Sequence, residues 1–181
     1  RLRNGLGEDA KLHIVVHSMG NRLVLKALSQ WSDADGVSRP IDQLALFAPD
    51  VGLNDFREWG PAAVARCRRV SLYTSRHDAA LIASKGLHAE QRVGDAFPPV
   101  LLEGVETIDC SAIDATSFLG HSYYGSNIDV LADLFMLLKR DHSASQRSHL
   151  QQKTSTEGTY WRWTATAPHD LWTWHFDHLA E

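Results

Sequence analysis

The chain has 181 residues, of which 44% are hydrophobic and 22% are charged, as expected for one globular domain. Its net charge of −4 argues against a nucleic-acid partner, and it contains no apolar run of about 18 residues that would predict a membrane span. Cys67 and Cys110 are too few for a disulfide framework, and we predict that both are small buried residues.

Apolar runs that predict strands alternate with helical patterns along the chain. The four predicted strands, the last of them at a sheet edge, are 12–16, 44–48, 70–74 and 105–109. The predicted helices are 19–31, a run from 54 that breaks at Gly60–Pro61 and then resumes, 78 to about 88, and a last helix that Ser126 caps. This order predicts an α/β fold, a parallel sheet with helices on both faces, with its chemistry at the carboxyl ends of the strands.

Helical spacing also predicts which faces are buried. In the first helix, the predicted buried stripe is Leu23, Val24, Ala27, Leu28 and Trp31. In the last helix, it is Ile128, Leu131, Leu134, Phe135 and Leu138.

The end of the chain differs in composition from the rest. Ser143 to Thr159 is polar and predicts a linker, and four tryptophans follow it. We therefore divide the chain into a region that carries the chemistry, 1–141, and a linker with a Trp-rich tail, 142–181. The histidines and aspartates of this tail lack the spacing of a metal site, so no metal is predicted.

Ser18 is the candidate nucleophile. It stands in Val16-His17-Ser18-Met19-Gly20, where an apolar strand ends and an amphipathic helix begins. On a sharp strand-to-helix turn, a serine hydroxyl projects above the sheet, and the amide of Met19 can donate to an oxyanion. Gly20 allows close packing of helix and strand, whereas Asn21 is expected to face solvent or a neighbouring loop.

His121 is the candidate base, because it lies in the loop after the fourth strand, from which a histidine can reach back over the sheet. His17 is poorly placed to accept the serine proton. An acid must orient the base, and two aspartates follow strands: Asp78 after the third and Asp50 after the second. We favour Asp78 and keep Asp50 as the alternative.

A succession of motifs resembles a known family. The motifs are His17-Ser18-Met19-Gly20-Asn21-Arg22, Ala48-Pro49-Asp50, Tyr73-Thr74-Ser75, Asp78-Ala79-Ala80-Leu81, Arg92-Val93-Gly94-Asp95 and Gly120-His121-Ser122-Tyr123-Tyr124. In this order they resemble a bacterial α/β-hydrolase family of the esterase and lipase superfamily, long of unknown function. The resemblance implies that Ser18, Asp78 and His121 form a catalytic triad, and that the substrates are esters.

The resulting prediction is a serine hydrolase that cleaves small carboxylic esters without a cofactor. Two alternative functions are compatible with the same sequence: a non-catalytic binding or scaffold module derived from a hydrolase, and an acyltransferase that uses the same triad. Hydrolases of this type have several strands before the nucleophile strand, so we expect that the amino-terminal strands are missing here. Residues 12–16 would then form an edge that upstream residues, the Trp-rich tail or a second copy of the chain covers.

Overall fold

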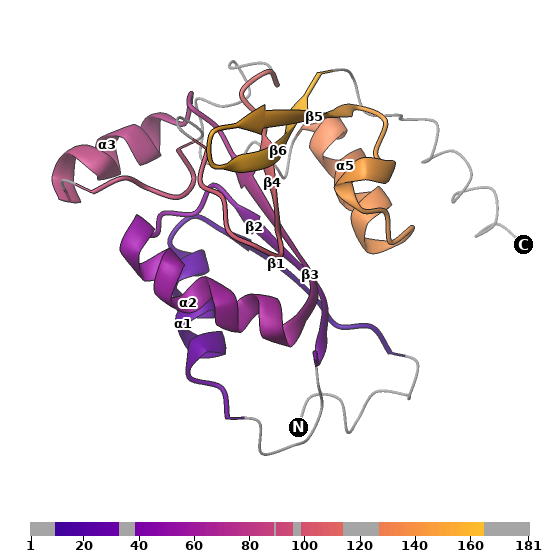
Figure 1. Cartoon of the computed structure of the whole chain (residues 1–181), viewed down its shortest axis with the longest axis horizontal. Helices are drawn as coiled ribbons and strands as arrows, with labels where there is room; N and C mark the ends of the chain where they lie inside the picture. The colour runs from indigo at the N-terminus through magenta and orange to yellow at the C-terminus, as the bar shows by residue number, and fades with distance from the viewer. Residues whose placement is uncertain (1–9, 33–38, 89, 96–98, 114–126, 165–181) are drawn as a thin grey trace, which may run out of the picture.

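The computed structural model describes residues 10–32, 39–88, 90–95, 99–113 and 127–164. Its centre is a six-stranded sheet in the order β1-β2-β3-β4-β6-β5 (Figure 1). Neighbouring strands are parallel except for β5, which is antiparallel to β6. The strands are β1 His13–His17, β2 Ile41–Phe47, β3 Cys67–Thr74, β4 Val105–Asp109, β5 Leu150–Ser155 and β6 Gly158–Trp163.

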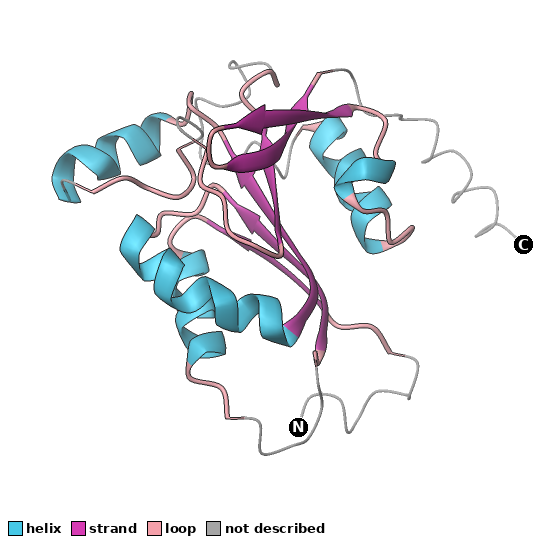
Figure 2. Cartoon of the chain, in the orientation of Figure 1, coloured by secondary structure: helices cyan, strands magenta, loops and turns pink. Residues whose placement is uncertain are grey.

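Helices cover both faces of the sheet (Figure 2). Helices α1 and α2 lie on one face and α5 lies on the other, whereas α3 lies beyond the end to which the parallel strands point (Figure 1). Their bounds are α1 Gly20–Ser29, α2 Leu53–Arg66, α3 Ala79–His88 and α5 Ile128–Leu138, with a short 3-10 helix at Ala144–Gln146. The predicted α/β fold with a largely parallel sheet is confirmed.

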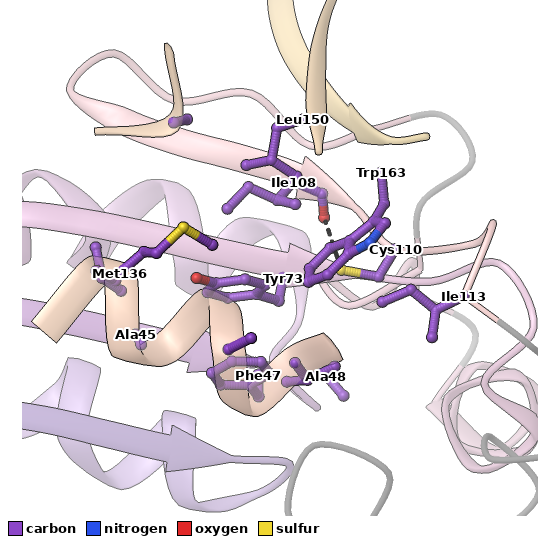
Figure 3. Close-up of a cluster of buried hydrophobic side chains, with 14 of the residues drawn as sticks. Ala45, Phe47, Ala48, Tyr73, Ile108, Cys110, Ile113, Met136, Leu150 and Trp163 are labelled. Atoms are coloured by element: carbon purple, nitrogen blue, oxygen red, sulfur yellow. Dashed lines mark hydrogen bonds between the residues drawn. The ribbon is translucent and has the colours of Figure 1, made fainter. Parts of the chain in front are cut away.

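Strand β2 shows how the two faces are built. Leu44 and Leu46 belong to the buried cluster beneath α1 and α2, whereas Ala45 and Phe47 belong to the cluster beneath α5. In the second cluster, the ring of Phe47 stacks on that of Tyr73 at 4.1 Å (Figure 3). Each fully buried Leu or Phe contributes about 1.5–3 kcal/mol, so this strand is a rigid base for the loop that follows it.

The expected linker is wrong. Much of Ser143–Thr159 forms β5 and its approach, and β6 then pairs with β4 through Ile108↔Trp161 and Asp109↔Arg162. Strand β4 is therefore internal and not an edge strand. The polar composition of the segment that forms β5 and β6 does not indicate strands, because its burial depends on a few widely spaced side chains, including Leu150, Tyr160 and Trp163.

The predicted buried stripes of two helices are right only in part: Leu28 is buried, and Val24, Leu134 and Leu138 pack against the core clusters. Helix α1 buries Asn21, Leu25 and Leu28, whereas Leu23 is 75% exposed. Helix α5 buries a face centred on an acidic residue, Asp133, rather than the apolar stripe that spacing favoured. That face comprises Val130, Ala132, Asp133, Met136 and Leu137. In both helices a polar side chain is turned inward by partners elsewhere in the chain, which spacing alone does not register.

Helix α2 runs unbroken through Pro61, contrary to the predicted break. Its buried residues lie on both sides of the proline: Phe56, Trp59 and Gly60 before it and Ala63 after it. Since one apolar face spans the proline, packing holds both halves in a single helix despite the lost backbone donor.

Strand β1 pairs with β2 alone among the described residues. Ile14 and Val16 pack against the cluster beneath α1 and α2, while Val15 points to the other face and is 43% exposed. The Trp-rich segment expected as one possible cover for this edge lies elsewhere as far as it is described, since Trp161 and Trp163 are in β6, beside β4.

Candidate active site

Ser18 lies in the tight turn between β1 and α1. Its φ angle is +52°, in the left-handed region that residues with a Cβ atom rarely adopt. That conformation costs about 1–2 kcal/mol for a residue other than glycine. The turn is so close that a Cβ at Gly20 would lie 3.0 Å from Cγ2 of Val16, which explains the glycine two residues after the serine.

Backbone hydrogen bonds attach this turn to the end of β2. The Ser18 amide donates to the Phe47 carbonyl at 3.0 Å, and the Asp50 amide donates to the Ser18 carbonyl at 3.3 Å. Asn21 lies beneath the turn with no exposed surface, contrary to the expectation that it faces solvent. Nothing in the helical spacing signalled this, because a small amide at that point of an amphipathic pattern is typical of the polar face.

The amide of Met19 lies next to the serine at the start of α1. It makes no hydrogen bond with the residues that the structure describes, although the Met19 carbonyl accepts one from the Arg22 amide at 3.1 Å. The Met19 residue is 70% exposed. A free amide at the amino end of a helix favours negative charge, so it can donate to an oxyanion formed beside Ser18.

Asp78 follows β3 and caps α3. Its Oδ1 atom accepts hydrogen bonds from the amides of Ala80 at 3.0 Å and Leu81 at 3.1 Å. The residue is 4% exposed, and its Oδ2 atom makes no hydrogen bond with any described residue. One carboxylate oxygen is thus fixed by the helix and the other is available to a further donor.

Asp50 has a different environment. Its Oδ1 atom accepts from the hydroxyl of Ser84 at 2.7 Å and lies 3.0 Å from Nε of Arg92. The Arg92 side chain is only 5% exposed, so this is a largely buried ion pair. Because loss of one charge from such a pair is strongly unfavourable, Asp50 is the required counter-ion of Arg92.

The segment that contains Arg92 connects the loops after β2 and β3. The Gly94 amide donates to the Pro49 carbonyl at 3.0 Å, and the Ser75 amide donates to the Gly94 carbonyl at 2.9 Å. A Cβ at Gly94 would lie 2.8 Å from the carbonyl carbon of Ala48, so only glycine fits between these loops. This bridge holds the backbones that carry Asp50 and Asp78 at the same end of the sheet.

His121 and the neighbouring Ser122 lie outside the described residues, so the structure does not bring the whole predicted triad together. His169, His175 and His178 of the tail also lie outside them. In the described part of the chain, no group of three His, Cys, Asp or Glu residues could hold a metal ion, and no helix is long and apolar enough to cross a membrane. A small pocket beside the start of α2 contains none of the candidate residues; it is lined by Leu53, Arg57, Gln91, Pro99, Val100, Leu101 and Glu157.

Residues 4–140 match the family described as "Alpha/beta hydrolase of unknown function (DUF900)". The chain belongs to this family. The suspected resemblance is thereby confirmed, and so is the α/β-hydrolase type of the sheet. In this α/β-hydrolase, the β5–β6 hairpin lies beyond the matched residues. No curated protein and no solved structure matched the chain.

Proposed function

We propose that this α/β-hydrolase is a serine hydrolase that cleaves carboxylic esters through an acyl-enzyme on Ser18. The observation that carries the proposal is the left-handed backbone of Ser18 at the end of β1, beside the Met19 amide, which makes no hydrogen bond with the described residues. A strained turn of this kind projects the hydroxyl away from the sheet, where a substrate carbonyl can approach it.

In the proposed reaction, His121 accepts the hydroxyl proton while Oγ of Ser18 bonds to the ester carbonyl carbon. The carbonyl oxygen becomes an oxyanion, to which the Met19 amide donates. The alcohol then leaves with the proton from His121, and an acyl-enzyme remains. Water, deprotonated by His121, then attacks that acyl group. The carboxylic acid is released, and Ser18 regains its hydroxyl proton from His121.

We assign the orienting acid to Asp78 rather than Asp50. In the described chain, each aspartate has an Oδ2 atom without a hydrogen bond, but Asp78 accepts only from neutral backbone amides, whereas Asp50 is already paired with the buried charge of Arg92. A histidine held by Asp50 would compete with the guanidinium for the same carboxylate. No cofactor takes part in this scheme.

Hydrolysis of p-nitrophenyl acetate tests the proposal. We expect Ser18→Ala to lower kcat at least about 1,000-fold, since loss of a triad nucleophile typically costs several orders of magnitude. Ser29→Ala is the matched control, because Ser29 is a half-buried serine at the last residue of α1, at the opposite end of this helix from Ser18. Unchanged turnover in a folded Ser18→Ala protein would refute the proposal. A folded wild-type protein with no turnover of any ester would favour the non-catalytic module instead.

A further inference from the structure

The structure assigns to Asn21 the role of a positioning residue, which holds Ser18 in its left-handed conformation; this inference rests on the proposed function. The side-chain amide nitrogen Nδ2 donates to the Ser18 carbonyl at 2.8 Å and to the Phe47 carbonyl at 3.1 Å. The Phe47 carbonyl also accepts the Ser18 amide. One side chain thus binds the carbonyl of Ser18 directly and also binds the carbonyl that accepts the Ser18 amide.

The Ser18 carbonyl is held by an unusual number of donors. It accepts from the Asn21 amide at 3.1 Å and from the Asp50 amide at 3.3 Å, besides Nδ2 of Asn21. A carbonyl oxygen has two lone pairs, so three donors restrain its direction closely. Since the direction of this carbonyl is set by the ψ angle of Ser18, the three donors oppose relaxation of the strained turn.

An asparagine meets a requirement that other side chains of its size do not. Two carbonyl oxygens face a single buried atom, which must therefore carry two hydrogens. Serine offers one hydrogen and leucine offers none. The amide orientation follows from the same contacts, because a reversed amide would place Oδ1 against two acceptors. Oδ1 itself is buried and has no hydrogen-bond partner in the described part of the chain, an unfavourable state that the two donated bonds must offset.

Asn21→Leu removes both donated bonds and keeps the branching and the number of heavy atoms of the side chain. We expect kcat for p-nitrophenyl acetate to fall about 100-fold while KM stays within about threefold, because a misplaced nucleophile impairs the reaction rather than binding. Asn21→Ser should give an intermediate loss, and it serves if the leucine variant does not fold.

Gln43→Met is the matched control. Gln43 is also a fully buried amide whose oxygen has no partner, but it lies near the amino end of β2 and donates to Asp141 at 2.7 Å. A merely structural role for Asn21 predicts that both substitutions lower melting temperature and leave kcat nearly unchanged. Equal effects on kcat in the two variants would overturn the inference.

A second measurement does not require activity. We compare Ser18→Gly with Ser18→Ala, which both lack the hydroxyl but differ in their tolerance of a positive φ. With Asn21 present, the glycine variant should melt about 2–4 °C higher, since it relieves the strain of the turn. In the Asn21→Leu background this difference should fall to less than half.

The two measurements separate the two ideas. If the melting difference depends on Asn21 but no ester is hydrolysed, Asn21 holds the turn as inferred and the proposed function fails. If the melting difference is the same in both backgrounds, Asn21 does not hold the turn, whatever the activity.

Discussion

Replacement of Arg147 by methionine should destabilise the protein far more than an ordinary surface change. Arg147 and Asp133 are both completely buried, and Nη1 of the arginine lies 2.8 and 2.7 Å from the two carboxylate oxygens. Tyr73 donates to Asp133 at 2.6 Å, and Nε2 of His149 lies 2.8 Å from it. Nη2 of the arginine reaches Glu106 at 3.3 Å. This cluster connects β3, β4 and α5 to the segment that leads into β5.

The expected loss of unfolding free energy follows from the burial of Asp133 and Arg147. Removal of one partner leaves a charge with no exposed surface, which costs about 3–5 kcal/mol. Asp133→Leu combined with Arg147→Met removes both charges, so we expect the double variant to be more stable than Arg147→Met alone. Urea unfolding followed by circular dichroism measures both quantities.

The destabilisation caused by Arg147→Met should also change with pH, in a direction that follows from the pKa of Asp133. Burial raises the pKa of Asp133, but Arg147, His149 and Tyr73 outweigh it and hold the pKa below its usual range. In the wild-type protein, Asp133 therefore stabilises the fold above the pKa of the unfolded chain, near 4, and this stability is lost as the pH falls through the lower folded value. In Arg147→Met the uncompensated burial raises that pKa, so the deficit in unfolding free energy should narrow from pH 7 to about pH 5. A deficit below about 1 kcal/mol at pH 7, or one that widens as the pH falls, would refute this reasoning.

Two further predictions concern the acid and the edge of the sheet. Asp78→Asn should lower kcat far more than Asp50→Asn, up to about 10⁴-fold if the wrong tautomer of His121 is held. Steady-state kinetics on both variants test this, and a larger loss of kcat in Asp50→Asn would contradict it. The outer edge of β1 should be covered in solution, for example by pairing with a second copy. Light scattering together with hydrogen exchange on residues 13–17 tests this, and a monomer whose amides there exchange freely would contradict it.

Local signals predicted the sheet and the turn. The apolar run before Ser18 and the glycine after it are enough to indicate a strand, a sharp turn and a helix, and the structure has all three. Asp78 stands at the start of the predicted helix from 78 to about 88, and in the structure it caps α3. Each of these features depends on residues within a few positions of one another, where sequence patterns are informative.

Long-range polar contacts were not predictable in this way. The inward face of α5 depends on Arg147 and His149, which lie in a segment whose composition is typical of a linker. Asn21 is fully buried and donates to the carbonyl of Phe47, 26 positions away in the chain. A polar side chain with a distant partner looks the same in sequence as a solvated one, so its burial depends on the fold itself.

Covalent labelling with a fluorophosphonate probe tests the assignment of Ser18 most directly. Trypsin releases the nucleophile in the peptide 12–22, in which Ser18 is the only serine, so mass spectrometry of this peptide locates the adduct. We predict a phosphonylated 12–22 peptide from the wild-type protein and none from Ser18→Ala. An intact protein that is labelled on a different peptide, or that is not labelled at all, would contradict it.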